Sequence, residues 1–255
     1  MVGHYRQYGQ TQMQGLDIVH QHYWRPFKAF GLTGNFWNIN YIIVINTWVV
    51  LGVIALFIIL ARIAIKREDN VFGYLVTWFA QAFSDLSIQS LGKFYFNHFA
   101  FVISLFTFIF LCNTLSVIPW LEEPTSDLNT TLGLGVTSFL YTQLSSIRAH
   151  GFLRHLKSFF QPFVFMFPIN VVESLAKIVS ISFRLFGNIF GVAVISKLYL
   201  KAIGGWWIGE LLGIMSGLNF ILIFFFVILD GGIQAFVFSM LSLTYLSLEV
   251  NHGEE

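Results

Sequence analysis

Long apolar runs, separated by short polar segments, dominate the pattern of this 255-residue chain. A helix that crosses a membrane needs about 20 mostly apolar residues, and the pattern offers several such runs. We predict about five spanning helices and, before the second of them, an amphipathic helix lying at the membrane interface. The expected spans cover about residues 39–63, 96–118, 131–147, 162–201 and 206–248, and the interfacial helix covers about 70–93.

The last two apolar runs are much longer than a straight crossing of the membrane requires. Excess length is accommodated by tilting or bending, so we expect two long, strongly tilted helices that form a hairpin. A Gly-Gly-Trp-Trp segment at 204–207 separates them, and tryptophan is typical of the membrane interface. The predicted fold class is therefore an all-α integral membrane protein, with residues 1–38 as an outside N-terminal tail and residues 39–255 as a single membrane domain.

Basic residues gather at two positions that this topology places on one side of the membrane. Arg62, Lys66 and Arg67 follow the first span, and the loop that follows the third span is basic between residues 148 and 157. The acidic loop at 121–129 falls on the opposite side. Because Lys and Arg are enriched in cytoplasmic loops, both basic clusters predict the cytoplasmic side and leave the N-terminus outside.

The composition supports this interpretation and excludes several classes of protein. Hydrophobic residues make up 56% of the chain and charged residues 11%, whereas a soluble domain has about 25% charged residues. Such a chain needs membrane lipid around it. The net charge of +1 gives no electrostatic reason to expect nucleic acid as a partner.

Motifs for catalysis or cofactor binding are missing from the sequence. No phosphate loop, catalytic triad or metal motif occurs, so we expect no enzyme activity from this chain alone, no cofactor and no metal site. His20 and His22 form a pair without a third ligand at a defined spacing, which favours a polar interfacial tail. The first ~35 residues are polar and aromatic, so we expect no signal peptide. Cys112 is expected to be a small buried residue.

Charged residues inside the last two apolar runs carry the functional argument. An arginine at the centre of a bilayer costs about 2.5–3.5 kcal/mol, and its guanidinium stays protonated at any relevant pH. We predict that Arg184 is buried and has no neutralising carboxylate within two turns of its own helix. Glu173 lies three turns away and is expected to pair with Lys177, four residues further on. Arg184 therefore requires a counter-charge from another chain.

Helical spacing places further polar residues beside this arginine. Each of the two long helices is expected to carry a polar stripe in an apolar body, and antiparallel packing would build a hydrated seam across the membrane. The stripes consist of Lys177, Arg184 and Asn188 on the first helix and of Asp230, Gln234 and Tyr245 on the second. For Ser180, Ser182 and Thr244 we expect only the joining of helices, which is common for polar residues in bundles.

At these residues the chain resembles subunit a of the rotary F-type ATP synthase. The resemblance rests on SFRLFGN at 182–188 and GGIQAFVFSMLSLTYLSLE at 231–249, and PTSDLNTTLGLG at 124–135 is also similar. It covers roughly residues 95–250. It implies a non-catalytic, proton-translocating stator that faces a ring of c subunits, is joined to peripheral stalk b subunits, and couples ion flow through two aqueous half-channels to rotation and ATP synthesis.

The resemblance also implies roles for individual residues. Arg184 corresponds to the family's essential arginine, which separates the half-channels and faces a carboxylate on each passing c subunit. Asn188 and Gln234 match the polar positions beside it, and Lys177 falls where the family has a basic residue. Glu173, one turn before Lys177, is a further candidate for the ion path.

This sequence departs from the family at an exchangeable pair of Glu and His residues, which are replaced here by Ala193 and Val227. Our hypothesis is that Asp230, one turn from Val227, serves as the acid of the outer half-channel. Glu210 is expected nearer the outer mouth. The competing interpretation is that Asp230 only pairs with Lys197 across the hairpin.

Several alternatives follow from the same residues. Asp127 and Asn129 either line the outer vestibule or cap the third span. A secondary transporter that binds an anionic solute at Arg184 is the second candidate function, and a purely structural scaffold leaves that charge unexplained. The choice between H⁺ and Na⁺ depends largely on the partner ring. We expect a multi-pass protein of the bacterial plasma (inner) membrane, with a mitochondrial or plastid inner membrane as the alternative.

Overall fold

A computed structural model describes most of the chain, and its contacts divide the chain into two units, Met1–Ile45 and Asn46–Glu255. In the first unit, strand β1 (Tyr23–Trp24) pairs antiparallel with strand β2 (Ile39–Asn40). Most of the predicted outside tail lies beyond the described residues. The residues described are 23–24, 39–66, 71–115, 121, 123–158, 160, 164–203 and 224–251.

Helices make up nearly all of the remaining described chain, which confirms the all-α fold class. In chain order they are α2 (Tyr41–Ile65), α3 (Val71–Leu91), α4 (Phe96–Thr114), the 3-10 turn η4 (Pro124–Ser126), α5 (Leu128–His150), α6 (Phe152–Ser158), the 3-10 turn η5 (Val164–Met166), α7 (Phe167–Ile203), the π-helix η6 (Phe224–Asp230) and α10 (Gly231–Asn251).

Among the described helices, four are long and apolar enough to cross a membrane. They comprise Ile42–Ile65, Phe96–Thr114, Phe167–Val192 and Val227–Val250. Helix α5 has 23 residues, which is long enough, but its many Ser, Thr and Gln residues make it less apolar than these four. The predicted crossing at 131–147 therefore stays a prediction, and the first part of the predicted last span, from 206 to 223, lies outside the described residues.

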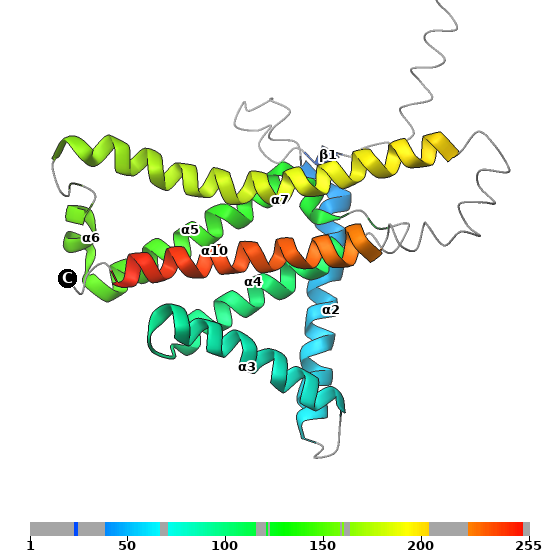
Figure 1. Cartoon of the computed structure of the whole chain (residues 1–255), viewed down its shortest axis with the longest axis horizontal. Coiled ribbons are helices and arrows are strands. Elements are labelled where there is room, and N and C mark those ends of the chain that lie inside the picture. The colour runs from blue at the N-terminus through cyan, green and yellow to red at the C-terminus, as the bar shows by residue number, and fades with distance from the viewer. Residues whose placement is uncertain are drawn as a thin grey trace, which may run out of the picture. The chain divides into compact units, whose positions relative to one another are not determined.

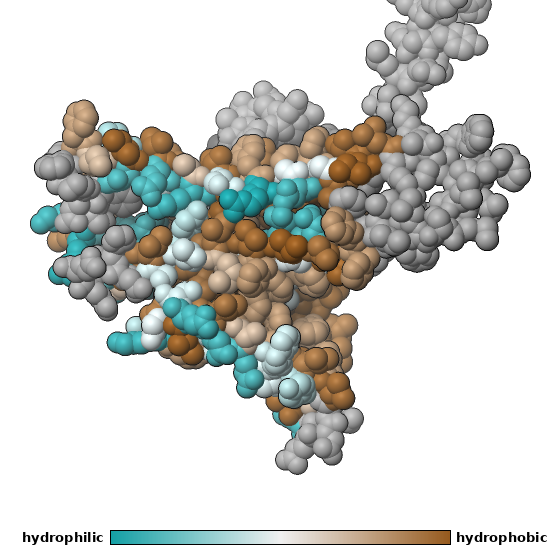
Figure 2. Space-filling model, viewed as in Figure 1, coloured by the Kyte–Doolittle hydropathy of each residue, from teal (hydrophilic) through white to brown (hydrophobic). Residues whose placement is uncertain are grey.

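The surface of the second unit is largely apolar, as expected for a protein surrounded by lipid. Large hydrophobic side chains are exposed along α2, with Trp48 70% and Ile59 55% exposed, and on α3, with Trp78 60% exposed. Figure 2 shows hydrophobic residues over much of one face. In water such a surface would drive aggregation, whereas lipid tails solvate it.

Helix α7 is too long to stand upright in a bilayer. Its 37 residues span about 55 Å at the helical rise of 1.5 Å per residue, whereas the hydrocarbon core is about 30 Å thick. Helix α10 lies against α7 and runs in the opposite direction (Figure 1). The predicted antiparallel packing of the last two helices is thus confirmed, and their tilt relative to a membrane stays a prediction.

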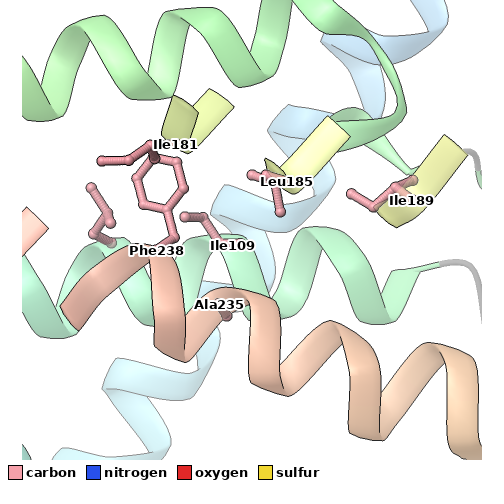
Figure 3. Packing of buried hydrophobic residues seen from close by; sticks show 7 residues of the cluster. Ile109, Ile181, Leu185, Ile189, Ala235 and Phe238 are labelled. Atoms are coloured by element: carbon pink, nitrogen blue, oxygen red, sulfur yellow. The ribbon is translucent and has the colours of Figure 1, made fainter. Parts of the chain in front are cut away.

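An aliphatic core joins three of these helices. Leu185 of α7 and Ala235 of α10 are 1% and 0% exposed, and Ile109 of α4 is fully buried between them. Figure 3 shows these side chains pointing toward one another. The core cluster consists of Leu105, Ile109, Ile181, Leu185, Ile189, Ala235 and Phe238.

Polar contacts join α5 to α10. The Ser138 hydroxyl donates to the Ser242 Oγ at 2.7 Å, and the Ser146 hydroxyl donates to the Glu249 carbonyl at 3.2 Å. Hydroxyl groups that bridge helices are a usual means of association in membranes. Part of the polar face of α5 is therefore satisfied by contacts with α10, although the helix is less apolar than its neighbours.

Helices α5 and α7 approach each other closely at a glycine. A Cβ atom added to Gly135 would collide with the Ser182 Oγ and would lie 3.2 Å from the Ile178 carbonyl oxygen. The Ser182 Oγ is buried and has no hydrogen-bond partner among the described residues. Gly133, two positions earlier, has open space where its Cβ would lie. Gly135 thus sets how deeply α7 seats on α5.

Candidate functional site

Arg184 lies on an open flank of α7. Its side chain is exposed, while the adjacent Leu185 and the nearby Ile181 face the core. An open flank is what the stator interpretation expects, and the burial of Arg184 within the membrane stays a prediction, because this exposure is that of the chain alone. Figure 2 shows hydrophilic residues gathered in a band along α7 and α10, with hydrophobic residues beside it. A guanidinium on a lipid-facing surface would be costly, so this flank needs water or a partner against it.

Arg184 and Gln234 come together where α7 crosses α10. Both line one crevice between these helices, and the crevice has ≈ 0 Å³ of room for water. The expected hydrated seam stays a prediction, while the expected meeting of the two polar stripes is confirmed in this crevice. Aliphatic side chains close it from within, and the other lining residues are Ile181, Leu185, Val237, Phe238 and Leu241.

A second polar contact joins the stripes towards the N-terminal end of α7. The Lys177 Nζ lies 2.9 Å from the Glu173 Oε1, which confirms the predicted pair. The same ammonium group lies 5.6 Å from the centroid of the Tyr245 ring on α10, within cation–π range. The Lys177 and Glu173 side chains are 27% and 60% exposed, so one end of the pair remains open.

A small cavity of ≈ 20 Å³ lies beside Lys177, between α5, α7 and α10. That volume is enough for about one water molecule. Tyr245, Glu249 and Gln143 also line the cavity, and the Gln143 Oε1 is buried without a hydrogen-bond partner among the described residues. A water in the cavity would satisfy it. Sequence reasoning missed Gln143 and Glu249, although Glu249 lies one turn beyond Tyr245 on the same face.

At the opposite end of α10, Asp230 immediately precedes the first residue of the helix and is partly buried. Asp230 closes the seven-residue π-helix η6, and π-helical turns often occur at functional sites. Beside it, the Asn113 Nδ2 donates to the Gly231 carbonyl at 3.1 Å, and the Thr125 hydroxyl donates to the Asn113 Oδ1 at 2.8 Å. Asn113 is 3% exposed. Sequence reasoning did not predict a role for Asn113, although an isolated amide side chain in an apolar run could have indicated one.

Asp127 is the N-cap of α5. Its Oδ1 accepts a hydrogen bond from the Asn129 backbone N–H at 3.2 Å. The capping interpretation of Asp127 is therefore confirmed, and a role of Asp127 and Asn129 in an outer vestibule stays a prediction. Thr244 donates to the Met240 carbonyl of its own helix, so the expectation that it joins two helices is wrong.

Some predicted residues lie outside the described part of the structure. Glu210, His20 and His22 belong to undescribed segments. The side chain of Lys197 is likewise not described, so its competing pairing with Asp230 stays a prediction. Asn188 is partly buried on α7, one turn beyond Arg184.

Comparison with known proteins agrees with this arrangement. The family model described as "ATP synthase A chain" matches residues 44–247. ATP synthase subunit a of Moorella thermoacetica is 35% identical over 84% of this chain and 92% of that protein. The Aliarcobacter butzleri subunit a is 32% identical over 81% and 92% of the two chains. The Propionigenium modestum protein, named "sodium ion specific", is 32% identical over 73% of this chain and 63% of its own length. The chain belongs to the ATP synthase subunit a family.

Proposed function

We propose that this chain conducts protons through two aqueous half-channels separated by Arg184, and that it passes each proton to a ring of c subunits. Its family makes it the ion-translocating stator subunit of an ATP synthase. The observation that carries the finer proposal is an exposed Arg184 beside a crevice that is closed to water. Because this crevice has no room for water, we infer that a moving partner group carries the ion past Arg184.

The helix face around Arg184 supports docking of another helix. Ser180, one turn before Arg184, and Gly187, just under one turn after it, are both exposed. Cβ atoms added to Gly187 or Gly191 would meet nothing within 4 Å. These glycines are thus not required by packing inside the described chain. Small residues at membrane-helix interfaces let two backbones approach closely, so we infer that a helix of the ring lies along this face.

The charge on Arg184 explains why such a helix would release and rebind a proton. A carboxylate surrounded by lipid prefers its protonated form because burial disfavours the charge. About 4 Å from a guanidinium, the ionised form gains roughly 4 kcal/mol at an effective dielectric constant of 20. That gain corresponds to about three pKa units. Each carboxylate therefore gives up its proton on one side of Arg184 and is reprotonated on the other side.

The two half-channels are proposed at opposite ends of α10. The inner one contains the ≈ 20 Å³ cavity beside Lys177 and Glu249. A cavity for one water suits a proton, which moves along hydrogen bonds. The outer one contains Asp230, which directly precedes α10 and lies four residues before Gln234. We retain Asp230 as its acid and Glu210 as a residue nearer its mouth.

The second candidate function, a transporter that binds an anionic solute at Arg184, is less well supported. Such a protein needs an enclosed site near the middle of the membrane. The crevice at Arg184 has no volume for a solute, and the guanidinium faces outward. We further propose that the chain is a non-catalytic subunit that contacts the c ring and the b subunits, and that it lies in the bacterial plasma membrane, with a mitochondrial or plastid inner membrane as the alternative.

Two neighbouring residues of α7 provide a matched test of the docking face. Ser180 and Val179 are both exposed at similar depth, but they point about 100° apart around the helix. We would place a cysteine at each position, attach a thiol-linked photo-crosslinker, and identify the products in assembled complexes. The single native cysteine, Cys112, is buried as expected and does not compete for the reagent.

We expect S180C to form a product with the small ring subunit and V179C to label mainly lipid. Equal yields from both positions, or a greater yield from V179C, would show that the ring lies against a different face. A S180C protein that purifies without any small hairpin subunit would instead favour the solute transporter.

A further inference from the structure

A large polar pocket lies at the end of the helices where the basic residues gather, away from the crevice at Arg184. Its volume is ≈ 620 Å³, within the usual range of small-ligand sites. It shares no lining residue with the crevice at Arg184 or with the cavity beside Lys177. The lining comes from the start of α4 and the ends of α5 and α10, and consists of Tyr95, Phe96, Asn97, His98, Tyr141, Ser145, Arg148, Ala149, His150 and Val250.

The charges on this lining favour an anion. Arg148 is exposed, and no carboxylate is among the lining residues. Helix α4 starts here, and its N-cap residue, Tyr95, makes no side-chain cap hydrogen bond. The backbone N–H groups of His98 and Phe99 both donate hydrogen bonds to the Tyr95 carbonyl oxygen. The N–H groups that precede them, together with the positive end of the helix dipole, attract negative charge.

Hydrogen bonds in the wall fix the state of His98. The Tyr141 hydroxyl donates to the Asn97 carbonyl at 3.0 Å. Having used its proton, this hydroxyl accepts from the His98 Nδ1, which lies 3.0 Å away. In this neutral tautomer the other ring nitrogen, Nε2, is an acceptor, so His98 shapes the wall of the pocket and offers no donor to an anion. His150 is also occupied, because its Nε2 lies 2.7 Å from the Val250 carbonyl.

Arg148 has a simpler interpretation, in which it only offsets the negative end of the α5 dipole. That role would not require a pocket or a second helix. Arg148, however, lines the same pocket as the start of α4 and His98.

Aromatic side chains also border the pocket: Tyr95 is 45% and Phe96 is 68% exposed. Exposed aromatics at the end of a spanning helix mark the depth of lipid headgroups, and basic pockets between helices at that depth suit anionic headgroups.

We propose that this pocket binds the phosphate group of an anionic phospholipid, with Arg148 and the first N–H groups of α4 contacting the phosphate oxygens. The acyl chains would lie against Phe96 and its aromatic neighbours. Inorganic phosphate offers the same oxygens without the chains, so the experiment includes both sources.

The test uses the assembled complex in nanodiscs of phosphatidylcholine with a trace of photoactivatable phosphatidylglycerol. Labelling of the peptide that contains residues 94–98 is measured as the lipid is titrated, for wild type, R148Q and R154Q. Arg154 is the matched control because it is exposed in the same basic region, on α6, but does not line the pocket. Equal assembly of the three proteins is checked first by the yield of intact complex.

We expect R148Q to need about tenfold more phosphatidylglycerol for half-labelling, as for the loss of one charge-assisted contact, and R154Q to match wild type. Saturable binding of radiolabelled inorganic phosphate that is lost in R148Q, without lipid labelling, would assign the site to free phosphate. Labelling that is equal in all three proteins, or that falls equally in both variants, with no phosphate binding, would overturn the proposal.

Discussion

The close contact between α5 and α7 at Gly135 makes a quantitative prediction about how Arg184 is positioned. An alanine at 135 would place its methyl group against the Ser182 Oγ and 3.2 Å from the Ile178 carbonyl oxygen. Over-packing of this kind costs about 1–3 kcal/mol. The serine hydroxyl can rotate, but the backbone carbonyl cannot move without α7. We therefore expect G135A to push α7, and Arg184 with it, away from α5.

Gly133 provides the matched control. It belongs to the same helix, and its Cβ would meet nothing within 4 Å. Replacing glycine by alanine in a helix favours the helix by about 1 kcal/mol in either variant, so the difference between G135A and G133A isolates the packing cost. We expect G135A to unfold at a lower temperature than G133A in detergent, and to lose coupling between ATP hydrolysis and proton pumping.

A third variant separates contact with Ser182 from other effects. Because the Ser182 hydroxyl has no partner among the described residues, S182A should cost little, and removing an unsatisfied buried hydroxyl can even stabilise a protein. The double variant G135A/S182A should recover part of the loss, so that it is less destabilised than the sum of the two single variants in a double-mutant cycle. Equal thermal stability of G135A and G133A would refute the reasoning, as would a cycle with no interaction.

Three further predictions concern the ends of the proposed path. D230N should slow ATP-driven proton pumping severely, because it removes the proposed acid of the outer half-channel. A normal rate in D230N would remove Asp230 from that half-channel. N113A should lower the free energy of unfolding by about 1–3 kcal/mol, because it leaves the Thr125 hydroxyl and the Gly231 carbonyl without their buried partner. A smaller loss of unfolding free energy, measured by calorimetry, would argue against the contact. E173Q should change the free energy of unfolding by no more than about 0.5 kcal/mol, as for an exposed ion pair one helical turn apart. A larger change would mean that a partner shields the ion pair from water.

The hydrophobic pattern was sufficient to predict where the helices lie in the sequence, but not which side of each helix faces another helix, lipid or a partner. The length of an apolar run depends on local composition, so α2, α4, α7 and α10 were predictable. The exposure of Arg184 depends on which side of α7 meets α10, and one polar stripe fits either arrangement. The core residues Leu185 and Ile181 occupy that side, and a sequence does not distinguish an aliphatic residue that faces lipid from one that faces a helix.

Residue pairs on one helix were also predictable, whereas contacts between helices were not. The Glu173–Lys177 pair follows from a spacing of four residues. The approach of Lys177 to Tyr245 and the hydrogen bond from Asn113 to Gly231 join residues that are far apart in the chain. Their register depends on the seating of Gly135 and on the π-helix η6, and both are properties of the packed fold.

The most direct test of the central claim is ATP-driven proton pumping in inverted membrane vesicles that contain R184A, beside wild type. The account predicts that pumping is abolished while the complex assembles in normal amounts and retains ATPase activity, because the ring carboxylates lose the charge that makes them release protons. Pumping at the wild-type rate in R184A would contradict the account, and Arg184 would no longer be the separator of the two half-channels.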